Sequence, residues 1–235
     1  MSSARIRVKV CCIASADEAK LAISAGADAI GLVGRMPSGP GPIADELIAQ
    51  IAARVPPPVA TFLLTAETSV DGVVDHARRT GTSAIQLVDW VDPADHERIR
   101  AQLGAAKLVQ VLHVEDERVL DQAHAAAATA DALLLDSGRT HSTVRELGGT
   151  GRVHDWELSR QIVAASRIPV FLAGGLDAAN VGDAIARVHP FGVDLCSGLR
   201  SEGRLDAAKL HAFFDAVLGA RRSSTHDVRV VDGER

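Results

Sequence analysis

The sequence predicts an α/β fold, a single (β/α)8 TIM barrel with eight parallel strands, and three observations lead to it. The chain has 235 residues, a length typical of one barrel domain. Short apolar runs alternate with longer amphipathic segments at about 29 residues per unit. The hydrophobic content of 47% includes only 3% aromatic residues, so the core must consist mainly of small and branched aliphatic side chains, as barrel interiors usually do.

The apolar runs are predicted strands because they are short and bounded by helix-forming or turn-forming segments. In chain order they cover residues 8–13, 29–33, 58–64, 84–87, 107–114, 131–136, 168–172 and 193–196. After the first run, Ser15 and Glu18 have the spacing of a helix capping box, and Gly26 stands where a C-cap glycine belongs. This pattern predicts a helix between the first two strands.

The alternative fold is a doubly wound open sheet, whose first turn should carry a glycine-rich phosphate fingerprint. The first turn here, residues 11–15, contains no glycine, which favours the barrel. We expect residues 1–220 to form the barrel domain. Residues 221–235 are predicted to be a polar, loosely ordered C-terminal tail.

Composition restricts the classes of partner. The formal net charge is −5 and no dense basic stretch is present, which argues against nucleic-acid binding. No run approaches the roughly 20 apolar residues that span a bilayer, and the first residues lack an apolar signal segment. We therefore expect a cytoplasmic protein without membrane contact, as a monomer or a homodimer.

Two glycine-bearing turns follow the last two predicted strands: Gly174 and Gly175 follow the seventh, and Ser197 and Gly198 follow the eighth. Glycines let backbone N–H groups approach an anion, and these two loops are the recurrent phosphate site of barrel enzymes. The glycines could instead only permit tight turns. Their occurrence in both of the relevant units favours a phosphate site.

Cys11 lies near the end of the first predicted strand. A thiolate is a competent base when a neighbouring ammonium or helix terminus stabilises it. Cysteine is also among the most buried residue types, so sequence position by itself favours a core residue.

Asp136 closes the apolar run of the sixth strand, and its side chain is expected to point at the barrel mouth. A carboxyl group there can be held protonated and donate a proton. The alternative is a helix N-cap or a carboxylate that anchors a loop.

The segment after Asp136 is too polar for a packed helix and long enough for an active-site loop. It contains Gly148, Gly149, Thr150 and Gly151. These residues could close over a substrate as a lid and present N–H groups to it.

Five motifs, in order and spacing, resemble the phosphoribosylanthranilate isomerase family from about residue 9 to residue 214. They are Lys9-Val10-Cys11, the strand ending at Asp136, Gly148 to Gly151 with Asp155-Trp156, Leu172 to Leu176 with Asn180-Val181, and Asp194 through Ser197-Gly198. The resemblance implies a barrel enzyme of tryptophan biosynthesis that uses no metal and no organic cofactor.

The resemblance also implies the reaction, an Amadori rearrangement of N-(5'-phosphoribosyl)anthranilate. The general base of the family falls on Cys11 and its general acid falls on Asp136. The acid protonates the ribose ring oxygen to open the sugar to an imine, and the base then removes the proton from the adjacent carbon.

The sequence departs from the family at four places, all expected on the side of the mouth that receives the aglycone. Cys12 replaces a glycine, residues 38–40 lack the arginine that grips the anthranilate carboxylate, Val88-Asp89 replaces His-Gly, and Leu199-Arg200 replaces Val-Glu. Arg35 or Arg139 could supply the missing carboxylate contact.

Three hypotheses therefore stand, all with a small phosphorylated molecule as the ligand. The first is an isomerase of phosphoribosylanthranilate. The second is a related sugar-phosphate isomerase or lyase whose aglycone lacks the carboxylate. The third is a non-catalytic barrel that binds a phosphorylated ligand.

Overall fold

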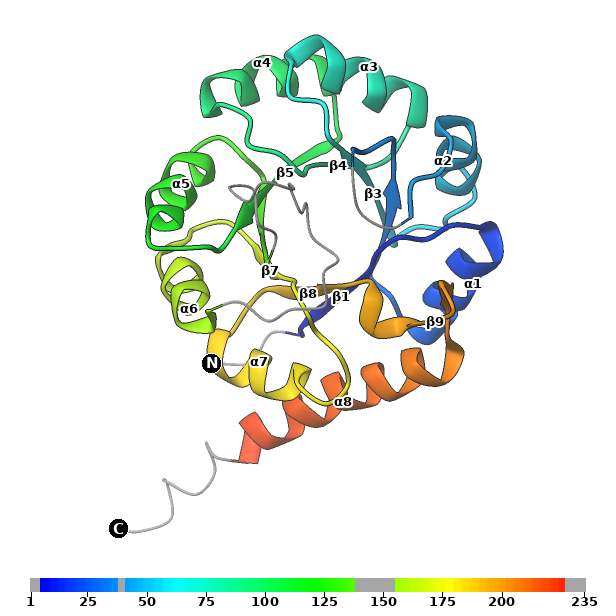
Figure 1. The fold of residues 1–235 in the computed structure, drawn as a ribbon, viewed down its shortest axis with the longest axis vertical. Helices are drawn as coiled ribbons and strands as arrows, with labels where there is room; N and C mark the ends of the chain where they lie inside the picture. The colour runs from blue at the N-terminus through cyan, green and yellow to red at the C-terminus, as the bar shows by residue number, and fades with distance from the viewer. Residues whose placement is uncertain (1–4, 38–40, 138–154, 227–235) are drawn as a thin grey trace.

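Eight parallel strands close into a barrel in chain order, with the last strand hydrogen-bonded to the first (Figure 1). The computed structural model describes residues 5–37, 41–137 and 155–226, and only the backbone of residues 221–226. The strands are β1 (Arg7–Val10), β2 (Ala29–Val33), β3 (Ala60–Thr65), β4 (Ala84–Leu87), β5 (Lys107–His113), β6 (Ala132–Asp136), β7 (Val170–Leu172) and β8 (Gly192–Leu195). The predicted fold class is confirmed.

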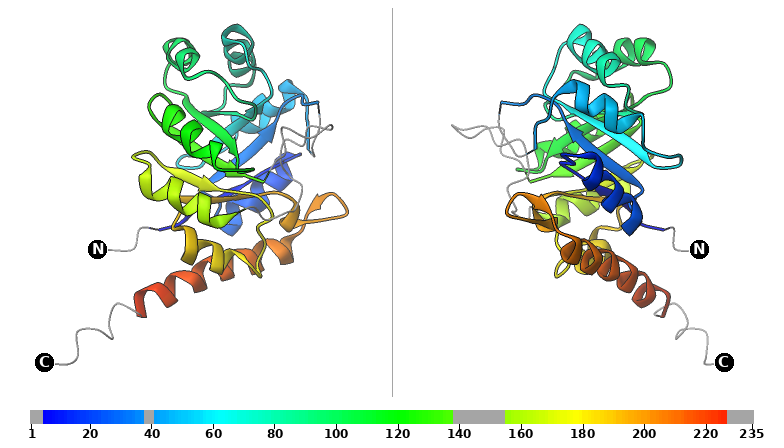
Figure 2. Two further views of the ribbon diagram at one scale, coloured as in Figure 1. Left: turned by 60° about the vertical axis from the view of Figure 1, so that its left-hand side comes forward. Right: turned by 90° about the vertical axis from the view of Figure 1, so that its right-hand side faces the viewer.

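Helices surround the barrel and alternate with its strands (Figures 1 and 2). They are α1 (Ala16–Ala25), α2 (Asp45–Ala52), α3 (Val70–Thr80), α4 (Pro93–Leu103), α5 (Arg118–Ala127), α6 (Trp156–Ala165), α7 (Val181–Val188) and α8 (Ala207–His226). Helix α8 packs against α1 and α7 and so completes the outer ring. None of the helices within the described ranges is long and apolar enough to cross a membrane.

The connection from β8 to α8 carries extra elements. A single 3-10 turn, η1 (Ser197–Leu199), leads into a short antiparallel pair of β9 (Arg200–Ser201) and β10 (Arg204–Leu205). Helix α8 then continues to His226, past the domain boundary predicted at residue 220. The rest of the predicted tail, residues 227–235, lies outside the described residues.

The first strand is shorter than predicted, since β1 ends at Val10 and the prediction extended to residue 13. Cys12 has a backbone φ of 60°, a left-handed conformation that extended strands do not contain. The strand therefore stops just before the cysteines.

Helix α1 begins and ends where its capping residues predict. Ser15 accepts a hydrogen bond from the Glu18 N–H at 3.2 Å, and Gly26 ends the helix with a φ of 108°. The Glu18 carboxylate accepts a hydrogen bond from the Ala14 N–H at 2.9 Å. In a capping box it would accept from the N–H of Ser15, the N-cap residue itself.

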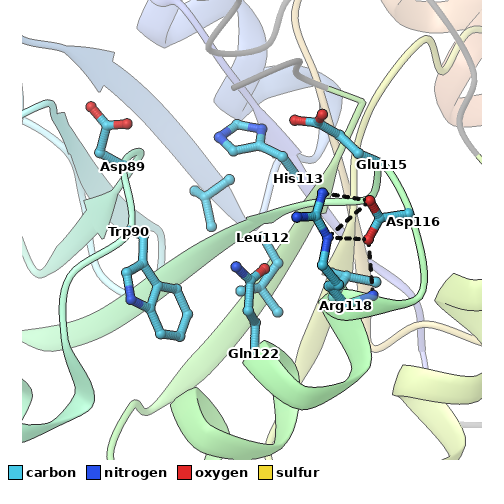
Figure 3. Close-up of a pocket in the computed structure, with 10 residues that line it drawn as sticks. Asp89, Trp90, Leu112, His113, Glu115, Asp116, Arg118 and Gln122 are labelled. Atoms are coloured by element: carbon cyan, nitrogen blue, oxygen red, sulfur yellow. Dashed lines mark hydrogen bonds and ion pairs between the residues drawn. The ribbon is translucent and has the colours of Figure 1, made fainter. Parts of the chain in front are cut away.

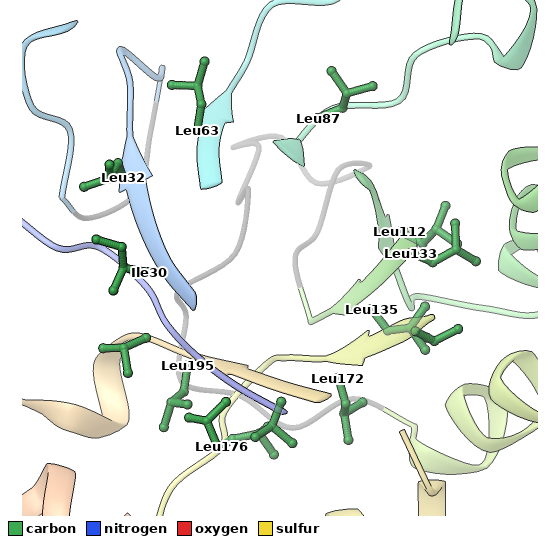
Figure 4. Packing of buried hydrophobic residues seen from close by; sticks show 14 of the residues in the cluster. Ile30, Leu32, Leu63, Leu87, Leu112, Leu133, Leu135, Leu172, Leu176 and Leu195 are labelled. Atoms are coloured by element: carbon green, nitrogen blue, oxygen red, sulfur yellow. The ribbon is translucent and has the colours of Figure 1, made fainter. Parts of the chain in front are cut away.

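The barrel separates two hydrophobic clusters because successive strand residues point to opposite faces. The larger cluster lies between strands and helices and contains Leu32, Leu63 and Leu133, each fully buried (Figure 4). The smaller one fills the barrel interior and contains Phe62 and Phe171, whose rings meet edge to face at 6.0 Å. Burying each such side chain contributes roughly 1.5–3 kcal/mol, and both layers leave the ends of the strands free to carry polar groups.

Candidate active site

Cys11 lies directly after β1, in the interior cluster, with 5% of its surface exposed. Its N–H donates to the Leu195 carbonyl at 2.9 Å, which ties it to the end of β8. On the other side it contacts β2, where a Cβ added to Gly31 would lie 2.7 Å from the Cys11 sulfur. Gly31 therefore makes the room that the thiol occupies.

Asp136 is the last residue of β6, and its side chain is half-buried. In the register of the barrel it pairs with His113 at the end of β5. Its carboxylate accepts the Ser137 N–H at 2.7 Å. The same Ser137 contacts β7, because a Cβ added to Gly174 would lie 2.8 Å from its Oγ. The end of β6 thus adjoins the first glycine turn.

A buried ion pair lies on strands β1 and β8. The Lys9 Nζ is 2.8 Å from Asp194 Oδ2, and the lysine side chain is 0% exposed. It also lies 5.3 Å from the centre of the Phe62 ring, a favourable cation–π distance. Burial opposes the charge, but the Asp194 carboxylate and the Cys11 sulfur hold the pKa of Lys9 above its ordinary value.

Cys11 and Asp136 both couple to this pair. The charge of Cys11 is one of the causes that raise the pKa of Lys9. Burial raises the pKa of Asp194, the Lys9 ammonium opposes that shift, and the charge of Asp136 adds to it. Each candidate catalytic residue therefore interacts with one member of the pair, Cys11 with Lys9 and Asp136 with Asp194. The pair was not predicted from the sequence, although a lysine and an aspartate within otherwise apolar strands are a signal that the sequence contains.

The two glycine turns meet at the ends of β7 and β8. Gly174 and Gly175 have φ values of 83° and 64°, which only glycine adopts without strain. A Cβ added to Gly198 would lie 2.3 Å from the Leu176 carbonyl oxygen, so the turn after β8 packs directly on the turn after β7. Ser197 begins η1 in that second turn.

The first turn is held rigid by Asn180. Its Nδ2 donates to the Gly175 carbonyl at 2.8 Å, and its Oδ1 accepts the Asp177 N–H at 3.0 Å. Helix α7 begins at the next residue. No described residue accepts a hydrogen bond from the backbone N–H groups of Gly174, Gly175, Ser197 or Gly198. These groups can therefore donate to an anion.

Two departures from the family motifs contact each other on this side of the mouth. The Arg200 guanidinium donates to the Cys12 carbonyl, and it pairs with Glu18 Oε2 at 3.1 Å. These contacts hold Cys12 and Arg200 next to α1, and the expectation that they face the aglycone stays a prediction. They lie at the ends of β1 and η1, because Cys12 leaves the strand at its positive φ and Arg200 turns back to α1.

The opposite side of the mouth is formed by the ends of β4 and β5. His113 lies there, and its Nε2 is 3.0 Å from the Val88 carbonyl. A carbonyl only accepts, so Nε2 carries the hydrogen. The other ring nitrogen, Nδ1, is buried and has no partner among the described residues.

A cavity of about 460 Å³ lies beside His113. Its lining includes Asp89, Trp90, Leu112 and Gln122 (Figure 3). Trp90 is 40% exposed and so offers an aromatic face to this rim. Val88 and Asp89 were identified as departures, but His113 was overlooked because it stands on the neighbouring strand.

Some predicted site residues cannot be placed. The lid candidates Gly148, Gly149, Thr150 and Gly151, together with Arg139 and residues 38–40, lie outside the described residues. Arg35 follows β2 and is exposed. Within the described ranges, no group of three or more His, Cys, Asp or Glu side chains could hold a metal ion.

The chain is similar over most of its length to known proteins of one family. Residues 8–216 match the family model described as N-(5'phosphoribosyl)anthranilate (PRA) isomerase. The chain is 37% identical over 217 residues to N-(5'-phosphoribosyl)anthranilate isomerase of Haloferax volcanii, covering 92% of this chain and 94% of the relative. The corresponding enzyme of Methanocella arvoryzae is 34% identical over 198 residues, covering 84% and 91%.

Solved structures of the same name have the same fold. Phosphoribosyl anthranilate isomerase from Thermotoga maritima superposes with a TM-score of 0.78 at 27% identity, covering 91% of this chain and 99% of that one. A second isomerase structure, in complex with reduced 1-(o-carboxyphenylamino)-1-deoxyribulose 5-phosphate, gives a TM-score of 0.75 at 26% identity over the same shares.

Proposed function

The chain belongs to the N-(5'-phosphoribosyl)anthranilate isomerase family, and from that premise we propose that Cys11 and Asp136 carry its acid–base chemistry. The enzyme is an intramolecular aldose–ketose isomerase of tryptophan biosynthesis. The observation that supports the assignment is their placement at strand ends: Cys11 follows β1 with its sulfur against Gly31, and Asp136 ends β6 beside the first glycine turn.

The 5'-phosphate of the substrate binds at the two glycine turns. The backbone N–H groups of Gly174, Gly175, Ser197 and Gly198 are the proposed donors, and α7 starts close behind the first turn. Backbone donors at a helix N-terminus suit a phosphate because they present partial positive charge without a mobile side chain. Binding here places the ribose over the interior cluster, between β1 and β6.

Asp136 acts as the general acid. Its protonated carboxyl group donates to the ribose ring oxygen while the bond from that oxygen to C1' breaks. The lone pair of the anthranilate nitrogen forms the C1'=N double bond, so the ring opens to an iminium. Asp136 suits this step because it is the last residue of β6 and adjoins the phosphate turn through Ser137.

Cys11 acts as the general base. Its thiolate removes the proton from C2', and the electron pair of that C–H bond forms the enolamine. Transfer of a proton to C1' and loss of the hydroxyl proton at C2' then give the ketose. Cys11 suits this step because it lies directly after β1 in the interior cluster, where Gly31 leaves room for its sulfur.

The test is turnover of N-(5'-phosphoribosyl)anthranilate, followed by its fluorescence, in Cys11→Ala and Asp136→Asn. Each substitution is expected to lower kcat by about 10²- to 10⁴-fold, the usual contribution of a general acid or base. Asp75→Asn changes an exposed carboxylate on α3, outside these roles, and is expected to retain wild-type turnover. Unchanged kcat in either Cys11→Ala or Asp136→Asn would refute that residue's role.

The wild-type protein tests the substrate in the same assay. Turnover of phosphoribosylanthranilate at ordinary efficiency contradicts two hypotheses: that the substrate has a different aglycone, and that the protein binds its ligand without catalysis. Binding of ribose 5-phosphate without turnover of phosphoribosylanthranilate would instead favour those two alternatives.

A further inference from the structure

The buried pair of Lys9 and Asp194 has no direct part in the proposed proton transfers. Its lysine is 0% exposed and its aspartate 6% exposed. Taking two charges out of water costs several kcal/mol for each ion, and buried pairs often add nothing to stability compared with apolar residues. Stability is therefore a weak reason for placing a lysine in the interior of this barrel.

The lysine lies close to the sulfur of Cys11. A Cβ added to Gly31 would be 2.7 Å from Cys11 Sγ and 3.1 Å from Lys9 Nζ. Both atoms approach the same point above β2, so they are less than about 6 Å apart. At that distance, inside a low-dielectric interior, an ammonium interacts strongly with a thiolate.

We propose that Lys9 is a positioning residue that stabilises the thiolate of Cys11 and thereby sets the pH range in which Cys11 acts as a base. The inference rests on the proposed role of Cys11. Asp194 and the Phe62 ring fix the ammonium in place, and the buried site keeps water from screening its charge.

The direction of the shift in the pKa of Lys9 gives the sign of its interaction with Cys11. Burial lowers the pKa of Lys9, because it opposes the charged form. The negative charges of Asp194 and Cys11 act in the opposite direction, and the pKa lies above its ordinary value. An interaction between two charges acts equally on both partners. The same contact must therefore favour the charged form of the sulfur.

Besides Lys9, the titratable group that interacts with Cys11 among the described residues is Cys12. Four further groups act on these neighbours: Asp194 on Lys9, Asp136 on Asp194, Cys196 on Cys12, and Arg200 on Cys196. The carboxylate of Asp194, and that of Asp136 once it has given up its proton, oppose a thiolate because they carry the same sign. Arg200 is engaged by Glu18 and by the Cys12 carbonyl. The favourable field at Cys11 is therefore assigned to Lys9.

The experiment measures the rate at which iodoacetamide alkylates Cys11 as a function of pH, with tandem mass spectrometry separating Cys11 from Cys12. Lys9→Met combined with Asp194→Asn removes both charges together. The midpoint of alkylation is expected to move to higher pH by about one unit, a tenfold change in the thiolate equilibrium. The acidic limb of the kcat/KM profile is expected to move with it.

Conservative and structural controls accompany the test. Lys9→Arg keeps the charge and is expected to keep the wild-type midpoint. Thr80→Val changes a buried polar residue on α3 and is expected to leave the midpoint unchanged. If the first double variant does not fold, Lys9→Gln with Asp194→Asn provides a polar replacement of similar shape.

An unchanged alkylation midpoint in the folded double variant overturns the proposal. A shift of equal size in Thr80→Val also overturns the proposal, because loosened packing would then explain the change in the alkylation midpoint. Alkylation of Cys11 does not require turnover. The experiment therefore tests the effect of Lys9 on the sulfur separately from the role of Cys11 as a base. If Cys11→Ala remains active while the midpoint still moves, the role of Cys11 fails and the effect of Lys9 on its sulfur stands.

Discussion

The two ends of the barrel mouth are built from different parts of the chain. The proposed phosphate end consists of the turns after β7 and β8, where the backbone of Gly174, Gly175 and Gly198 supplies the shape and the proposed donors. The opposite end consists of side chains at the ends of β4 and β5, among them His113.

The difference explains why one end matches the family motifs and the other does not. A backbone site depends on conformations that only glycine adopts easily, so its residues are constrained one by one. A side-chain site can be rebuilt from a neighbouring strand. His113 on β5 bonds to the carbonyl of Val88, which directly follows β4 at the position where the family motif has a histidine.

The largest effect is expected from Gly198→Ala, which tests the phosphate end. The added methyl group would lie 2.3 Å from the Leu176 carbonyl oxygen, so the two turns must move apart. A displacement of about 1 Å in a binding site costs up to roughly 100-fold. We expect KM for phosphoribosylanthranilate to rise by about that factor, measured by steady-state kinetics.

Gly182→Ala is the matched control for this substitution. Gly182 lies in α7, and its added Cβ would be 4.0 Å from Ala220, an ordinary contact. KM is expected to stay the same and stability to rise by up to about 1 kcal/mol, because alanine favours helices over glycine. Equal KM values for the two variants would show that the turns do not hold the phosphate.

A smaller effect is expected from His113→Leu, which tests the other end. The substitution removes the buried ring nitrogens while keeping an apolar side chain of similar reach. We expect reduced 1-(o-carboxyphenylamino)-1-deoxyribulose 5-phosphate to bind about tenfold more weakly, the cost of roughly one hydrogen bond. Ribose 5-phosphate, which lacks the aglycone, is expected to bind within about twofold of wild type.

Calorimetric titration of both ligands checks this result. His124→Gln, on the exposed face of α5, is the control and is expected to bind both ligands normally. The contrast between the two ends fails if His113→Leu weakens both ligands equally, because His113 would then act on the whole pocket.

The smallest effect is expected from Glu18→Gln, which tests the support behind the phosphate end. Burial raises the pKa of the Glu18 carboxyl, but hydrogen bonds from Arg200 and from the Leu205 and Ala14 N–H groups outweigh it, so the pKa lies below the ordinary 4.5. We expect the variant to lose about 1–2 kcal/mol of unfolding free energy at neutral pH.

The pH dependence of that loss has a definite sign. A lowered folded-state pKa gives stability that is present above the ordinary carboxyl pKa and disappears as pH falls through the folded-state value. Urea unfolding at several pH values should therefore show the two proteins converging at acidic pH. Asp17→Asn, at a carboxylate that is 93% exposed, should match the wild type throughout; a difference that persists below the folded-state pKa would contradict the assignment.

Much of the fold and part of the candidate site could be predicted from sequence. The periodic apolar runs predicted all eight barrel strands, and Ser15 with Gly26 marked the ends of α1. Strand β1 ended early because the left-handed Cys12 could not be recognised from its residue type. Helix α8 extended beyond residue 220 because polar residues can continue a helix whose inner face is already packed.

The positions of Gly174, Gly175, Gly198, Cys11 and Asp136 at strand ends followed from the sequence by itself, because each depends on local backbone conformation or on the end of one apolar run. The partners of those residues depended on the closed barrel. Lys9 meets Asp194 only because β8 pairs with β1 in a particular register, and Arg200 reaches Glu18 and Cys12 only through the turn after η1. Charge pairing acts through space, so only the tertiary structure decided which groups could influence the sulfur of Cys11.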